Sequence, residues 1–258
     1  MHTLELQGID LTRAVVEGDG DAVALIREAL LKGSGTDPIE HALIAAERAM
    51  AAACPDGRGS TACLDIAGRL RGAARALSEA LDPVAVSVAD AAGTVTLASL
   101  PGDIHDVGRH LWRAVMVLRG HRAPDLGVLA PALVARRVAA ARPDALGVYV
   151  MDHRGRPAVQ SLVDHLLRRG AETPVLLSGP GVDQDFAVWV SVPTGADHYW
   201  PGVNYCEDTD EALEVLRQIV LYEPPPQIHE HDHDPYGGLD ACGGCCDCAL
   251  QTDCDLQA

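Results

Sequence analysis

The sequence predicts an α/β protein in which an N-terminal four-helix bundle precedes a doubly wound, five-stranded parallel sheet. Apolar residues recur at helical spacing up to Leu81, and beyond that point short apolar runs alternate with helical segments. After Tyr222 the composition shifts to His, Asp, Gly and Cys, with too little apolar surface for a core. We therefore expect a helical domain at residues 1–82, an α/β domain at residues 83–222 and a flexible tail at residues 223–258.

Capping and breaking residues delimit the helices of the first domain. Leu11 begins a short helix, and Asp21 is placed to cap a second helix that Gly33 ends. Pro38 stands at the first position of a third helix, which its fixed φ favours. The predicted helices span residues 11–17, 22–31, 38–50 and 63–81.

The α/β domain follows the break at Asp82-Pro83. Its predicted strands span residues 94–99, 124–129, 145–151, 174–177 and 197–200. Its predicted helices span residues 107–119, 130–141, 157–169, 184–190 and 209–221. Repeated strand–helix units of this kind are typical of a doubly wound parallel sheet.

The charge of the chain argues against nucleic acid or an anionic membrane as its main partner. The formal net charge is -17 and basic residues form no cluster, whereas phosphate binding relies on Lys and Arg. No run of eighteen apolar residues occurs, and residues 1–17 lack a basic start followed by an apolar stretch. We expect a soluble, cytoplasmic protein.

A short loop between the first strand and the following helix is the candidate site for chemistry. Asp103 stands two residues before His105, at the carboxyl end of a strand, where doubly wound sheets bind ligands. The pair could form a metal ligand whose carboxylate fixes the imidazole tautomer. Alternatively, Asp103 caps the helix and His105 lies exposed in the loop.

The loop and its surroundings resemble the corrinoid (vitamin B12)-binding proteins of the methionine synthase and corrinoid methyltransferase type. Leu100-Pro101-Gly102-Asp103-Ile104-His105-Asp106-Val107-Gly108 is similar to the central signature of that family. Residues 14–19, 29–33 and 42–50 resemble its helical cap, and residues 125–127, 143–147 and 195–197 fall where its later landmarks are expected. The similarity therefore runs in order along most of the chain.

The resemblance implies a flavodoxin-like domain that binds cobalamin base-off beneath a helical cap, with the nucleotide tail threaded into the α/β domain. It implies that His105 is the lower axial ligand of cobalt and that Asp103 bonds the distal imidazole nitrogen. Gly102 and Gly108 would let the backbone pass close to the cofactor. The other residues expected to contact the cofactor are Ile104, Asp106, Val107, Val148, Tyr149, Ser178 and Gly179.

The sequence departs from the family in three places. Tyr149 stands where the family has a serine, Ser178-Gly179 replaces a Gly-Gly pair, and residues 51–62 lack the usual aromatic-rich, acidic segment of the cap. A domain that keeps the fold without the cofactor is therefore an open alternative. The other histidines that we considered, at positions 110, 121, 153, 165 and 198, are mostly expected on the surface or in loops, with His153 a candidate for the corrin rim.

The tail carries a possible second metal site. Its cysteines are Cys242, Cys245, Cys246, Cys248 and Cys254, a spacing that could bind zinc or an iron–sulfur cluster. The alternating tract His229-Glu230-His231-Asp232-His233-Asp234 could bind a divalent metal. A solvated tail with free thiols is the alternative.

Three functions are compatible with these features. The first is a corrinoid protein that serves as the methyl-carrying subunit for partner methyltransferases, and so at most one subunit of an enzyme system. The second is a cobalamin-responsive sensor or regulatory adaptor that acts through protein partners. The third is storage or delivery of cobalamin or metal.

Overall fold

The computed structural model describes residues 11–32, 36–53, 60–81, 92–102, 106–191 and 202–221. All of them belong to one compact unit that spans residues 1–222. The sequence-predicted tail at residues 223–258, with its candidate cysteine and histidine ligands, lies outside the described residues. None of the described helices is both long enough and apolar enough to cross a membrane.

The N-terminal helices match their prediction closely. Residues 11–16 are helical, followed by α2 (Ala22–Leu31), α3 (Asp37–Ala52) and α4 (Thr61–Leu81). Asp21 caps α2, because its Oδ1 accepts hydrogen bonds from the backbone N–H groups of Val23 at 3.0 Å and Ala24 at 3.1 Å. Pro38 lies in the first turn of α3, where its missing N–H costs nothing.

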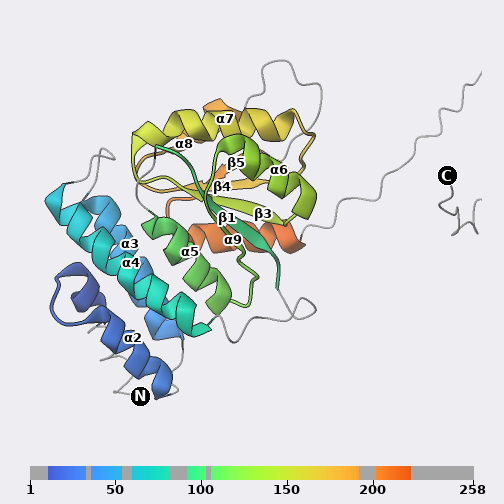
Figure 1. Ribbon diagram of the computed structural model, residues 1–258. Helices are drawn as coiled ribbons and strands as arrows, with labels where there is room; N and C mark the ends of the chain where they lie inside the picture. Colours follow the sequence, from blue (N-terminus) through green and yellow to red (C-terminus); the bar gives the residue numbers. More distant parts are fainter. Residues whose placement is uncertain are drawn as a thin grey trace, which may run out of the picture. The chain divides into compact units, whose positions relative to one another are not determined.

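Five parallel strands form the sheet in the order β2-β1-β3-β4-β5 (Figure 1). Their bounds are β1 Val95–Ser99, β2 Asp125–Val128, β3 Ala145–Tyr149, β4 Val175–Ser178 and β5 Val203–Tyr205. Every residue of β1, β3 and β4 is buried, as expected for central strands covered on both faces. The order is that of the flavodoxin-like fold, whose switch point lies between β1 and β3. This confirms the predicted fold class.

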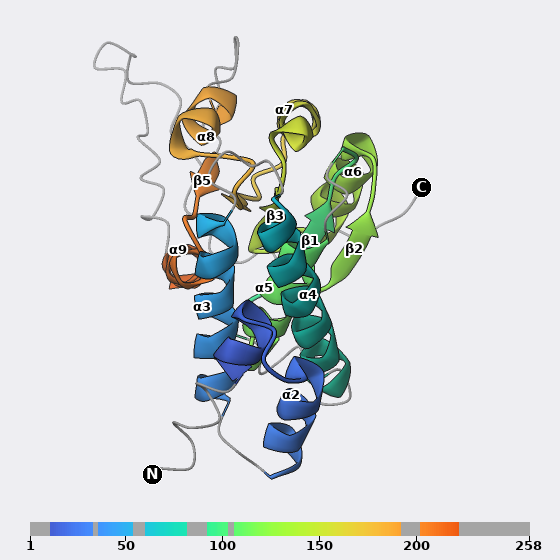
Figure 2. The ribbon, with the colours of Figure 1, turned by 90° about the vertical axis from the view of Figure 1, so that its left-hand side faces the viewer.

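Helices cover both faces of the sheet. They are α5 (Val107–Leu118), α6 (Pro131–Ala141), α7 (Arg156–Leu167), α8 (Gln184–Ser191) and α9 (Thr209–Leu221), with a 3-10 turn, η2 (His153–Gly155), before α7. One apolar cluster joins the sheet to α5, α9 and the N-terminal helices, and a second joins the opposite face to α6, α7 and α8. Figures 1 and 2 show α4 lying along α5, so the N-terminal helices reach the sheet through that helix.

The fifth strand lies at a different place from its prediction. Residues 197–200 fall outside the described residues, whereas the structure has β5 at Val203–Tyr205. All three residues of β5 are only half-buried, because this strand forms an edge of the sheet. A strand this short, with polar Asn204 at its centre, carries no apolar run to mark it.

Leu111 tests the shared core. Its side chain in α5 is fully buried in the cluster that joins the sheet to the N-terminal helices. We expect Leu111→Ala to lower the free energy of unfolding by about 2–5 kcal/mol, because it leaves a cavity there. Urea denaturation measures the change. Leu133→Ala on α6 is the control: its side chain is 39% exposed, and we expect a change within about 0.5 kcal/mol. Equal losses in the two variants would contradict this description of the core.

Candidate functional site

The candidate site lies at the carboxyl ends of β1, β3 and β4. The segment after β1 was the sequence-predicted centre, but Asp103, Ile104 and His105 lie outside the described residues. The structure does describe both sides of that loop. Gly102 has a φ of +97°, and a Cβ at this position would lie 3.1 Å from the carbonyl oxygen of Arg154. Only glycine suits this turn, in which the loop passes close to η2.

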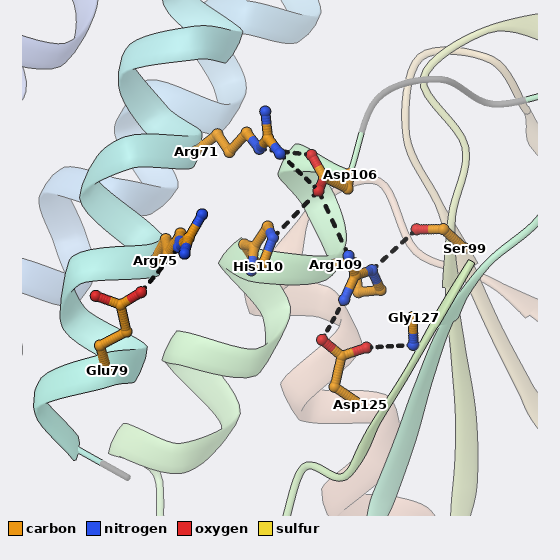
Figure 3. Close-up of polar contacts among 9 residues, drawn as sticks. All are labelled: Arg71, Arg75, Glu79, Ser99, Asp106, Arg109, His110, Asp125 and Gly127. Carbon is orange, nitrogen blue, oxygen red and sulfur yellow. Dashed lines mark hydrogen bonds and ion pairs between the residues drawn. The ribbon is translucent and has the colours of Figure 1, made fainter.

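Asp106 begins α5 and holds the N-terminal helices to it (Figure 3). Its carboxylate forms a two-pronged ion pair with Arg71 of α4, at 2.6 Å from Nε and 3.0 Å from Nη2. It also meets His110 Nε2 at 3.3 Å and Arg109 Nη2 at 3.5 Å. Burial by itself would raise the pKa of Asp106, but the charges of Arg71, His110 and Arg109 outweigh it and the pKa lies below its ordinary value.

His110 is a member of this cluster to which sequence reasoning assigned no role. Its side chain is 16% exposed, and burial and then the charge of Arg109 lower its pKa below the ordinary value. The signal was present in the sequence, since His110 follows Asp106 by one helical turn. Arg71 carried no such signal, because its partner is far away along the chain.

Arg109 connects the start of α5 to the last residue of β1 and the first residue of β2 (Figure 3). Its buried guanidinium donates to Ser99 Oγ at 3.2 Å and forms an ion pair with Asp125. Asp125 in turn accepts a 2.7 Å hydrogen bond from the backbone N–H of Gly127. This series of hydrogen bonds and ion pairs satisfies the buried charge of Arg109 and fixes the relative positions of β1, β2 and α5.

The Tyr149 ring fills the space between two glycines at the end of β3. A Cβ added to Gly108 would lie 1.9 Å from Tyr149 Cγ, and one added to Gly179 would lie 2.8 Å from Tyr149 Cε1. Gly179 has a φ of +108° as well, and its added Cβ would meet the Val150 carbonyl oxygen at 2.4 Å. The ring lies edge-on to Trp112, with centroids 6.1 Å apart.

The structure brings some of the sequence-predicted contact residues together and separates others. Gly108, Tyr149, Ser178 and Gly179 meet over the carboxyl ends of β3 and β4, next to the switch point, and Ser178 pairs with Tyr149 in register. Val107 is part of the core beneath α5, and Val148 packs into the core on the opposite face of the sheet.

Glu47 of α3 is a buried carboxyl next to Tyr149. Its Oε2 accepts a 2.9 Å hydrogen bond from the backbone N–H of Thr209, and the Tyr149 hydroxyl also bonds its carboxyl group. Burial is the largest cause that raises the pKa of Glu47 from 4.5 to about 7, with Asp208 adding to it. Glu47 therefore joins α3 to both β3 and α9.

Two hollows lie away from this edge of the sheet. One, of about 500 Å³, lies between the C-terminal end of α5 and α9 and includes Arg119, His121 and Arg217. The other, of about 420 Å³, includes Arg142, Asp144 and Arg169. Among the described residues no group of three or more His, Cys, Asp or Glu side chains is placed to hold a metal ion.

Known proteins resemble the chain in sequence and in fold. No family model matches it. Methionine synthase from Mycobacterium tuberculosis is 24% identical over 131 residues, which are 50% of this chain and 11% of that enzyme. The chain thus matches about a tenth of the length of this relative.

Three solved structures resemble the chain, and the first of them supports the fold. A monomethylamine corrinoid protein from Methanosarcina barkeri has a TM-score of 0.56 at 20% identity, covering 81% of this chain and 96% of that one. A methanol:cobalamin methyltransferase complex from the same organism has a TM-score of 0.46 at 22% identity, covering 83% and 80%. A cobalamin-binding protein from Desulfitobacterium hafniense has a TM-score of 0.45 at 19% identity, covering 81% and 96%. The predicted resemblance to corrinoid-binding proteins is confirmed.

Arg71 tests the attachment of α4 to the site. We expect Arg71→Met to lower the free energy of unfolding by about 1 kcal/mol, because Asp106 loses its two-pronged partner. Arg75→Met is a matched control on the same helix: Arg75 forms its ion pair with the neighbouring Glu79 (Figure 3) and feels Asp106 only as a more distant charge, and we expect a change within about 0.5 kcal/mol. Urea denaturation of both variants measures the difference. A larger loss in the control would show that the Asp106 pair does not hold α4.

Glu47 gives a pH signature. Below about pH 4.5 the carboxyl is protonated in the folded and unfolded chains alike; between about 4.5 and 7 only the unfolded chain releases the proton, so stability falls. Above that range the loss is constant, at roughly 3 kcal/mol in total. We expect Glu47→Gln to abolish this part of the pH dependence, measured by urea denaturation from pH 4 to 8. Parallel pH profiles for wild type and variant would contradict it.

Proposed function

We propose that this chain binds a corrinoid at the carboxyl edge of its sheet, with His105 as the lower axial ligand of cobalt and Asp103 bonded to the other imidazole nitrogen. One observation carries the proposal: the segment that resembles the family signature joins β1 to α5 at the switch point, where doubly wound sheets bind ligands. The similarity to methionine synthase and to a corrinoid protein of the same fold supports it.

Several features of the described residues favour a complete corrinoid at this edge, and one opposes it. Gly102 lets the loop turn sharply before residues 103–105, and Asp106 is fixed directly after them. Ser178 Oγ and Trp112 Nε1 are buried without a hydrogen-bond partner among the described residues, so each could form a hydrogen bond with a bound group. The opposing feature is the Tyr149 ring, which fills the space between Gly108 and Gly179.

The residues of the chain position the ligand loop. Arg71 and Arg109 hold Asp106 from two sides, so the backbone directly after His105 is fixed to α4 and α5. The N-terminal helices then lie beside the site and would exclude water from it. A bound corrinoid supplies the cobalt nucleophile, which is chemistry that no side chain provides.

The finer role that we propose is a methyl-carrying subunit. In this role the chain orients the corrinoid, while partner methyltransferases bind the methyl donor and the acceptor. The names of the relatives support this role, since methionine synthase and a monomethylamine corrinoid protein are among them.

Reconstitution tests the corrinoid site. Aquocobinamide has no base of its own, so an imidazole signature in its absorption spectrum must come from the protein. We expect the wild type to take up cobinamide with that signature, and His105→Ala to lose the signature and to bind roughly tenfold more weakly. Absorption spectra after gel filtration provide the measurement, and hydroxocobalamin is tested in parallel.

His165→Ala is the matched control, because His165 lies on α7 on the opposite face of the sheet. We expect it to behave as the wild type. The proposal fails if the wild type retains neither corrinoid, and the ligand assignment fails if His105→Ala keeps the imidazole signature.

A further inference from the structure

The Tyr149 side chain fills a narrow space between the start of α5 and the end of β4, which we call the switch-point crevice. Gly108 begins one wall at the N-terminal turn of α5, and Gly179 forms the other just after β4. Between them lies the ring of Tyr149, which is only 4% exposed. Neither glycine could carry even a methyl group while the ring is there. The backbone walls and the ring are therefore fitted to one another.

The ring is held from three sides. Trp112 contacts it edge-on at an interplanar angle of 86°, and the tyrosine hydroxyl bonds the carboxyl group of Glu47. The carbonyl oxygen of Val150 and the backbone of Gly179 close the space beyond it. A ligand arm can enter only if the whole ring leaves its packing and the hydroxyl leaves its carboxyl partner.

Two residues next to the ring, Ser178 and Trp112, have buried polar side-chain atoms without a hydrogen-bond partner among the described residues. Ser178 is fully buried and pairs with Tyr149 in register, so the two side chains stand on the same face of the sheet. Its Oγ has no hydrogen-bond partner among the described residues, and the same holds for Nε1 of Trp112. Buried polar atoms are nearly always bonded, and ones without a partner indicate a place where a polar group can bind.

We propose that Tyr149 is a specificity-determining residue that closes the switch-point crevice, so that the chain prefers corrinoids that lack a nucleotide arm. This inference rests on the proposed corrinoid site and adds the class of corrinoid that it accepts. The corrin ring is held at the carboxyl edge of the sheet, and the arm that would enter between Gly108 and Gly179 is excluded by the tyrosine ring. The unbonded Ser178 Oγ, on the same face of the sheet as the ring, is then a polar atom that such an arm would meet once the ring is removed.

Separate binding measurements with two corrinoids test the specificity role of Tyr149. Cobinamide lacks the nucleotide arm and cobalamin carries it, so equilibrium ultrafiltration with each gives the preference directly. We expect the wild type to bind cobinamide at least tenfold more tightly than cobalamin. In Tyr149→Ser the crevice is open and a hydroxyl replaces the ring, and we expect the preference to shift toward cobalamin by at least tenfold.

Tyr149→Phe is the matched control. It keeps the ring and removes only the hydroxyl, so the preference for cobinamide should stay within a factor of about three of the wild type. Far-ultraviolet circular dichroism and urea denaturation establish that each variant is folded. If Tyr149→Ser does not fold, the wild type and Tyr149→Phe still decide, because both must exclude the arm.

The outcomes distinguish a failure of the specificity role from a failure of the corrinoid site. Tighter binding of cobalamin than of cobinamide by the wild type overturns the specificity role and leaves the corrinoid site standing. An unchanged preference in a folded Tyr149→Ser variant also overturns it. If neither corrinoid binds the wild type, the proposed function and the specificity role fall together.

Discussion

The double packing of α5 is the constraint on which the rest of the structure depends. Eight of its twelve residues are buried, because one side of the helix lies on β1 and β3 while the other lies against α4. A helix buried on two sides must meet its neighbours at close range, and the sheet beneath it accordingly carries Gly147. A Cβ at that position would lie 2.8 Å from the ring of Trp112. The N-terminal helices and the sheet therefore share one core.

The same constraint explains the polar cluster at the start of α5. Arg109 is buried because it lies on this helix. A buried guanidinium requires hydrogen-bond partners, which Ser99 and Asp125 supply. Asp106 directly precedes α5, and Arg71 reaches it there from α4. The polar network thus lies at the N-terminal end of the helix. Its position beside the candidate ligand loop follows from the architecture, whatever the loop binds.

The sequence predicted local features well and contacts between distant segments poorly. The bounds of α2 and α9 were predicted to the residue, since capping and helical periodicity are local signals. The strand β5 was misplaced because an edge strand of three half-buried residues has no periodicity to detect. The pairs Arg71–Asp106 and Glu47–Tyr149 join segments far apart in the chain, so no sequence spacing predicts them.

For Tyr149, the sequence showed an unusual residue, and only the structure shows that two glycines make room for it. The roles of Asp103, His105 and the tail cysteines remain predictions.

The fit between Tyr149 and its glycine neighbours also bears on how substitutions at these positions depend on one another. The Tyr149 ring excludes a side chain at position 108, whereas at position 179 the Val150 carbonyl and the positive φ disfavour one as well. Removal of the ring would therefore relieve this clash at position 108, while the other two constraints at position 179 would remain. A substitution of Gly108 while Tyr149 is present would place a side chain inside the tyrosine ring. The two positions are therefore coupled in this structure: a side chain at position 108 requires that the ring at position 149 be replaced first.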